Sequence, residues 1–385
     1  MQYDELHAWL RLVHSVGASA ARRLLAQFGA PEAIWQASAA QWRSCASAAQ
    51  AQALAQPPEG FDALLARTWQ WLTQDDGAGA RAIVTLGASA YPPALLATAD
   101  PPLLLYLQGA PAFVRPAHGG FAPAASLAIV GSRNPTAQGA ENARRFARAL
   151  HEAGLTIVSG LALGIDACAH EGALDALPDP QRPATIAVVG TGLDRVYPRA
   201  HQQLARRIAQ NGLLVSEYPL GTPPLPANFP KRNRIISGLS LGTLVVEAAL
   251  QSGSLITARL ANEQGREVFA IPGSIHAPQS RGCHALIRDG AKLAETAQDV
   301  LEELQLPTPT QLPDTGATAQ ATPPADGGSD DPILQALGFD PMGLDALIAR
   351  TGYGAAELQV RLLELELAGQ VERLPGGLFQ RVMRA

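Results

Sequence analysis

The chain has 385 residues, 47% of them hydrophobic, which is enough to bury the cores of two or three domains. Its formal net charge of -5 argues against a protein that coats nucleic acid over its whole surface. The charge is uneven, however, because residues 126–295 hold 17 Lys and Arg against 13 Asp and Glu, a net of +4. A nucleic-acid or nucleotide ligand is therefore expected in the middle of the chain.

Cysteine spacing and hydropathy exclude two further classes. Cys45, Cys168 and Cys283 lie far apart without CxxC or Cys/His spacing, so we expect reduced thiols and no metal. The first residues, MQYDELHAWL, lack a basic segment followed by an apolar run, and no later run approaches the roughly 18 apolar residues of a membrane span. We expect a soluble, cytoplasmic protein with no membrane contact.

Residues 1–85 show apolar positions at helical spacing, as in LHAWLRLVHSV and FDALLARTWQWL, and are predicted to form a small helical domain. The turn at Val16 and Gly17 suggests a helix-hairpin-helix, with Arg22 and Arg23 beside a DNA phosphate. A plain helical packing unit is the alternative.

Residues 86–305 alternate short apolar strands with amphipathic helices. This pattern predicts a parallel sheet covered on both faces, which is a doubly wound, Rossmann-like α/β domain. The expected strands are Leu103–Leu107, Leu127–Val130, Thr156–Ser159, Thr185–Val189, Leu213–Ser216, Leu244–Val246 and Val268–Ile271. The expected helices include residues 138–153, 199–211 and 255–265.

The carboxyl-terminal part begins after a segment of biased composition. Residues 306–331 are rich in Pro, Thr, Gly and Asp and lack Lys and Arg, which predicts a disordered linker. Residues 332–385 read as three helices and a hairpin around Pro375-Gly376-Gly377, which is a winged-helix domain. Its net charge is -1, so we expect a protein-contact or accessory module; a sequence-specific regulator is the alternative.

Ligands of open α/β sheets bind beyond the carboxyl ends of the strands. Gly131, Ser132 and Arg133 follow the strand LAIV directly and suit a phosphate, because Arg can clamp two of its oxygens. A structural turn is the other interpretation of this short motif. It lacks GxGxxG, so neither NAD nor another cofactor is expected.

A second set of cations lies between residues 228 and 273. Lys231, Arg232 and Arg234 surround Asn233 in a loop before a buried strand, and Lys231 is one of only two lysines in the chain. The Gly/Ser/Thr turn at Ser252–Thr257 then opens a helix, whose free N–H groups attract anions. A phosphate site is the prediction, and a solvated charge run is the alternative.

The loop that follows the predicted strand Thr156–Ser159 begins at Ser159 and Gly160 and runs into a helix with Asp166 and His170. These last two share a helix face as an acid/base pair would, although Asp166 bracing the loop is the preferred interpretation. No nucleophile elbow, Walker A loop or HExxH motif is present, so we expect binding and no enzymatic activity. Tyr218 and Phe229 are candidate stacking platforms, with core packing as the alternative.

Several blocks together resemble the DprA, or Smf, family of DNA-processing proteins. The most specific are AIVGSR at residues 128–133, SGLALGIDACAHEGAL at 159–174, NFPKRNRIISGLS at 228–240 and VVEAALQSGSLITA at 245–258. The resemblance covers about two hundred residues in order. Gly282-Cys283-His284 departs from the Gly-Thr-Asn usual in the family.

The resemblance implies a bacterial homodimer that binds single-stranded DNA. It implies delivery of the strand to the recombinase RecA during natural transformation, with single-strand-binding protein displaced from the strand or sharing it. The family's binding pocket uses the Gly-Ser-Arg loop and the basic segment. The corresponding DNA-binding residues here are Gly131, Ser132, Arg133, Lys231, Arg232 and Asn233, to which the strand-end positions Ser159, Gly160 and Arg234 are added.

A LOG-type nucleotide phosphoribohydrolase is the enzymatic alternative, because that class shares the sheet topology. It requires a PGGxGTxxE motif that supplies a catalytic acid. The nearest Gly-rich stretch, Gln251 to Ser254, follows the strand-end Glu247 instead of preceding a glutamate.

Overall fold

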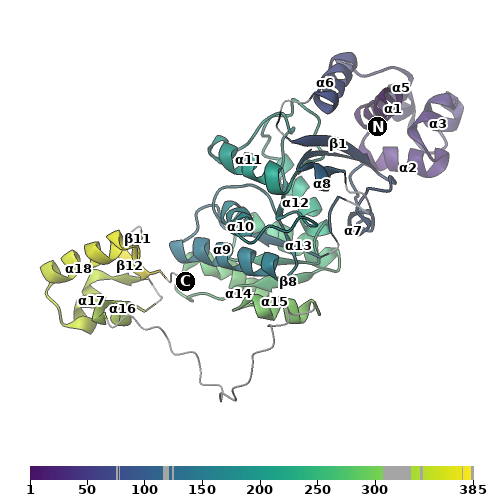
Figure 1. Cartoon of the computed structure of the whole chain (residues 1–385). Coiled ribbons are helices and arrows are strands. Elements are labelled where there is room, and N and C mark those ends of the chain that lie inside the picture. The colour runs from purple at the N-terminus through teal and green to yellow at the C-terminus, as the bar shows by residue number, and fades with distance from the viewer. Residues whose placement is uncertain are drawn as a thin grey trace, which may run out of the picture.

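The computed structural model describes residues 1–74, 77, 79–115, 121–123, 125–306, 331–338, 341–374 and 376–382. Figure 1 shows three parts in chain order: a group of helices, a large sheet with helices on its faces, and a small carboxyl-terminal unit. The predicted linker at residues 306–331 lies outside the described residues except at its two ends. Among the described helices, none is long and apolar enough to cross a membrane.

Six helices form the amino-terminal part: α1 (Tyr3–Ser15), α2 (Ala18–Phe28), α3 (Pro31–Gln36), α4 (Ala39–Trp42), α5 (Ala48–Ala55) and α6 (Phe61–Thr73). Arg22 of α2 pairs with Asp100 and donates to the Pro101 carbonyl at 3.0 Å, and Arg23 donates to the Cys45 carbonyl at 3.0 Å. Both cations of the helix-hairpin-helix hypothesis are therefore engaged within the protein.

The central sheet has nine strands in the order β1-β2-β6-β5-β4-β3-β7-β8-β9. Their bounds are β1 (Ala80–Thr85), β2 (Leu104–Gly109), β3 (Ser126–Val130), β4 (Thr156–Ser159), β5 (Thr185–Val188), β6 (Leu213–Ser216), β7 (Gly242–Val245), β8 (Glu267–Ala270) and β9 (Lys292–Leu293). The strands from β6 to β9 run parallel, as the apolar runs predicted.

Two features of the sheet edge correct the expectations from sequence. Residues 80–85, assigned above to the helical domain, form the edge strand β1, and β2 runs antiparallel to both β1 and β6. The burial of β1 alternates at its start, as in a strand with one solvent-exposed face. Such a short polar-apolar pattern is easily assigned to the end of the preceding helical region.

Helices cover both faces of the sheet, because successive side chains of a strand point to opposite sides. Leu127 and Ile129 of β3 join one core with α9 (Ala137–Glu152), α10 (Ile165–Leu174) and α15 (Ala297–Glu303). Ala128 and Val130 join the other core with α12 (Asn228–Gly238), α13 (Ser254–Glu263) and α14 (Arg281–Arg288). Helix α11 (Gln202–Asn211) packs beside β6 in the core shared with the amino-terminal helices. The remaining short helices are α7 (Pro93–Leu96), α8 (Pro111–Val114), η1 (Arg199–His201) and η2 (Pro278–Ser280).

The carboxyl-terminal unit is a winged helix, as predicted. It comprises α16 (Pro332–Leu337), β10 (Met342–Gly343), α17 (Leu344–Thr351), α18 (Ala355–Leu367), β11 (Val371–Leu374) and β12 (Leu378–Arg381), with strand order β10-β12-β11. Its buried residues form a core of their own. It lies beside α9 in Figure 1, and the Ala137 amide at the start of α9 donates to Glu372 Oε2 at 2.9 Å.

Candidate nucleic-acid interface

A cavity of about 640 Å³ lies where the loops after several parallel strands meet the start of α12. Five of the nine predicted site residues line it: Gly131, Ser132, Arg133, Arg232 and Asn233. Its other walls come from the loop after β4, the loop before η1 and residues 249–257, including the Ser252–Thr257 turn that the sequence singled out. The remaining four predicted residues, Ser159, Gly160, Lys231 and Arg234, are not part of its lining.

Arg133 lies in a loop whose backbone is hydrogen-bonded to the rest of the domain, while its own guanidinium has no partner among the described residues. The Ile165 amide donates to the Ser132 carbonyl at 3.0 Å, which ties the loop to the start of α10. Ser132 Oγ accepts from the Asn134 amide at 3.1 Å. The Arg133 side chain is exposed and has no hydrogen bond or ion pair to any described residue. A loop of this kind offers a fixed, uncompensated guanidinium to a ligand.

The basic segment forms the helix α12 and not the loop that the family resemblance implied. Ile235 and Ile236 are buried on the sheet side of α12, and Pro230 is tolerated in its first turn because N–H groups there have no intrahelical partner. The helix therefore separates three consecutive polar residues: Arg232 points inward, Lys231 is exposed, and Asn233 reaches the cavity.

Arg232 is a buried cation at the cavity wall. Its Nη1 donates to the Val188 carbonyl at 2.6 Å, and only 4% of the residue is exposed. Burial lowers the pKa of Arg232, and the neighbouring Asp166 carboxylate opposes that shift. A Cβ at position 160 would collide with this guanidinium, so Gly160 makes room for Arg232 instead of for a ligand.

Asp166 braces the loop after β4, as predicted. Its Oδ2 accepts from the Gly160 amide at 3.1 Å and the Ala162 amide at 3.2 Å. His170 Nδ1 lies 2.7 Å from Thr185 Oγ1, and burial lowers its pKa to about 3, which keeps the ring neutral at neutral pH. Asp166 and His170 thus have separate structural partners and do not form an acid/base pair. Ser159 is also committed, since its hydroxyl donates to the Ile129 carbonyl at 2.6 Å.

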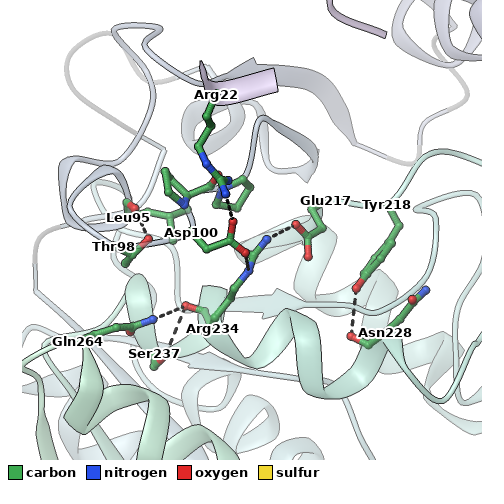
Figure 2. Close-up of polar contacts among 12 residues, drawn as sticks. Arg22, Leu95, Thr98, Asp100, Glu217, Tyr218, Asn228, Arg234, Ser237 and Gln264 are labelled. Atoms are coloured by element: carbon green, nitrogen blue, oxygen red, sulfur yellow. Dashed lines mark hydrogen bonds and ion pairs between the residues drawn. The ribbon is translucent and has the colours of Figure 1, made fainter. Parts of the chain in front are cut away.

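Arg234 belongs to an ion-pair network behind the cavity. Figure 2 shows its guanidinium between Asp100 and Glu217, with Arg22 of α2 on the far side of Asp100. The Arg234 Nε to Asp100 Oδ2 distance is 3.0 Å. Burial raises the pKa of Glu217, and Arg234 opposes that rise. Arg234 therefore anchors α12 to the sheet and the amino-terminal helices, and its charge is balanced before any ligand arrives.

Two aromatic rings meet at the cavity, one of which the sequence did not single out. The rings of Tyr197 and Phe229 have centroids 5.6 Å apart and planes 37° apart, and both residues line the cavity. Tyr197 is 48% exposed, so about half of the residue is accessible to a ligand. Tyr218 is instead directed to the Asn228 carbonyl at 3.2 Å and is absent from the lining. The only sequence signal for Tyr197 was its place in GTGLDRVYP, a loop after a strand.

Glu247, which the enzymatic alternative raised, and Cys283, where the sequence departs from the family, both have partners within the protein. Glu247 Oε1 accepts from Thr136 Oγ1 at 2.6 Å and Oε2 from the Thr136 amide at 3.0 Å, so this carboxylate faces the start of α9. Burial raises the pKa of Glu247. Cys283 is buried beneath β7 with Sγ 3.7 Å from the Val245 carbonyl. The described residues contain no group of three potential metal ligands.

The fold and site together define a Rossmann-like protein with an arginine-bearing, aromatic-lined cavity at its strand ends. The DNA recombination-mediator protein A family matches residues 82–305, and the DprA winged helix domain matches residues 317–377. The chain belongs to the DprA/Smf family, which confirms the resemblance noted in its sequence.

Individual relatives agree with this assignment. Protein Smf of Escherichia coli K12 is 44% identical over 318 residues, covering 82% of this chain and 80% of that protein. DNA processing protein DprA of Streptococcus pneumoniae R6 is 51% identical over 179 residues, covering 46% and 61%. The X-ray structure of DprA from Streptococcus pneumoniae is 35% identical with a TM-score of 0.63, and the match covers 79% of this chain and 98% of that one.

Proposed function

We propose that this protein binds single-stranded DNA in the cavity between the Gly131–Arg133 loop and α12. The observation that carries this is the unpartnered Arg133 guanidinium, which shares one cavity with the buried Arg232 and the exposed Tyr197 ring. A cation beside an aromatic face suits a phosphate with its unstacked base, and that pairing gives affinity without sequence preference. Duplex DNA keeps its bases stacked and would have to flip one out to use the same cavity.

The biological role follows from family membership together with this chemistry. We propose that the protein protects incoming strands in the cytoplasm during natural transformation and delivers them to RecA recombinase. We further propose that it acts as a homodimer, and that single-strand-binding protein shares or leaves the strand during the transfer.

The proposal is tested by comparing single-stranded and duplex DNA of equal length and sequence in a gel-shift or anisotropy titration at several salt concentrations. We expect tighter binding of the single strand, with affinity falling steeply as salt rises. Equal affinity for both forms, or binding that ignores salt, would contradict a cavity built for an unstacked base and its phosphate.

We also propose that the cavity binds without catalysing hydrolysis, because Glu247 faces α9 and Asp166 holds two backbone amides. The purified protein is expected to leave DNA and AMP intact. Release of free adenine from AMP that Glu247→Gln abolishes would instead support the phosphoribohydrolase alternative.

A further inference from the structure

A second hollow, larger than the first, lies along α11. Its volume is about 1060 Å³, and one stripe of α11 faces it, at Gln202, Ala205, Arg206, Ala209 and Gln210. These positions recur at the spacing of one helix face. The floor is apolar, from residues such as Leu161 and Val189 that belong to the core beneath. We call this hollow the α11 groove.

The described lining of the α11 groove carries a net positive charge. Its described lining includes Arg195, Arg199 and Arg206 against the single carboxylate of Asp194. Asp194 is already engaged, because it pairs with Arg195 at 3.2 Å and accepts from the Gly221 amide at 2.8 Å. Arg199 and Arg206 are exposed and have no hydrogen bond or ion pair to any described residue. The groove therefore has two exposed arginine side chains without a partner among the described residues, as the cavity has Arg133.

The α11 groove and the cavity share two stretches of wall, where consecutive residues line the two hollows. Leu161 lines the groove and Ala162 lines the cavity, while Val196 lines the groove and Tyr197 the cavity. Consecutive Cα atoms are about 3.8 Å apart, so the two hollows adjoin at both places. His201 Nδ1 lies 3.0 Å from the Leu161 carbonyl, which fixes the start of α11 beside this shared wall.

We propose that the α11 groove holds the continuation of the same DNA strand, with Arg199 and Arg206 contacting its phosphates after it passes Tyr197. The inference rests on the proposed function and extends it from a site for one nucleotide to a binding path for several nucleotides of the same strand. A polyanion requires a row of cations along such a path, and Arg199 and Arg206 supply them. An acidic peptide would satisfy the same cations, but the shared walls with the cavity favour the strand.

The test uses the length of the strand. Fluorescently labelled dT4 and dT20 are titrated with the full chain, with Arg199→Ala/Arg206→Ala, and with Arg207→Ala as matched control. Arg207 is the next residue on α11 but pairs with Asp175 at 2.7 Å and does not line the groove. Because both altered arginines are exposed and unpaired, we expect unchanged thermal melting; the single charge reversal Arg206→Glu serves as a second variant.

For dT20, the double variant is expected to lose about 1.4 from the slope of log affinity against log salt, at about 0.7 per phosphate contact. Its loss of affinity between 50 and 200 mM salt should then be about sevenfold smaller than in the wild type. We expect dT4 to occupy the cavity in preference to the groove, so its binding should change less than twofold in every variant, and Arg207→Ala should behave as wild type.

Three outcomes would overturn the inference. They are wild-type binding of dT20 by the double variant, an equal loss for dT4 and dT20, and an effect of Arg207→Ala as large as that of the double variant. Failure of the wild type to bind either oligonucleotide would be a different result, because it would reject the proposed function itself.

Discussion

The cavity region and the winged helix differ most in what their cations do. Arg133 in the cavity lining and Lys231 on the neighbouring surface of α12 are exposed and lack ion-pair partners among the described residues. In the winged helix, the four described arginines all have internal contacts: Arg350 with the Ala336 carbonyl, Arg361 with Asp331, Arg373 over the Phe379 ring, and Arg381 with the Leu334 carbonyl.

The third helix of the winged helix sharpens this contrast. A winged helix that reads duplex DNA inserts such a helix in the major groove, where phosphates require cations. Helix α18 instead exposes Val360, Leu363 and Leu367, at 59%, 55% and 82%, on a surface that also carries Glu364 and Glu366. Unpartnered cations, and not the type of fold, are therefore what distinguish the proposed DNA-binding site from the winged helix.

The largest expected effect concerns the buried Asp166 carboxylate near Arg232. Asp166→Asn keeps one oxygen that can accept from the Gly160 and Ala162 amides but removes the negative charge that opposes the burial cost of Arg232, so we expect a loss of about 1–3 kcal/mol of unfolding free energy. The matched change in the winged helix, Arg361→Ala, removes an exposed pair 3.8 Å apart and should cost less than about 1 kcal/mol. Urea unfolding measures both, and equal costs would contradict the contrast.

The free cation of the cavity is expected to have the next largest effect. Arg133→Ala should weaken single-strand binding by about tenfold or more, since a charge-assisted hydrogen bond contributes about 1.5–3 kcal/mol, and should lower the salt slope by about 0.7. Arg148→Ala on α9 is the control, because that exposed arginine already pairs with Glu152. Wild-type affinity for Arg133→Ala would place the binding site elsewhere.

Acid should act on the cavity region through its buried histidine. The pKa of His170 is about 3 in the folded protein, against about 6.5 unfolded, so the unfolded state binds the extra proton between these values. Its stabilising contribution is complete above pH 6.5 and is lost as pH falls, by up to about 1.4 kcal/mol per pH unit. We expect His170→Asn to flatten this slope in urea unfolding at pH 4–7; an unchanged slope would contradict it. Residues 332–385 contain no histidine, so the winged helix lacks this response.

The smallest effect is expected from removing the winged helix. Its core is separate from those of the remaining chain, so a protein ending at Leu306, the proposed boundary, should fold. We expect its affinity for single-stranded DNA to remain within about twofold of the full chain, since no phosphate contact is lost. A large loss of single-strand affinity would contradict this expectation. Micromolar binding of duplex DNA by the full chain but not by the truncated protein would also contradict it, because the winged helix would then be a DNA-binding module.

The sequence by itself determined the architecture and the best part of the site. Apolar runs separated by amphipathic helices predict a parallel sheet, since strands buried on both faces have no polar alternation. All seven predicted strands occur in the sheet, and six of them, β3 to β8, run parallel. The position of Gly131, Ser132 and Arg133 after such a strand placed them correctly at the cavity. The order of elements also predicted the winged helix, and its net charge follows directly from the amino-acid sequence.

Only the tertiary structure decided which polar residues remain available to a ligand. Arg232, Arg234 and Lys231 are chemically alike and nearly adjacent in sequence, yet one is buried against Val188, one lies between Asp100 and Glu217, and one is exposed. Partners such as Asp100 lie 134 residues away along the chain, and no local pattern encodes them. The Tyr197 platform and the α11 groove arise in the same way, because packing brings distant loops together and leaves some cations without a partner.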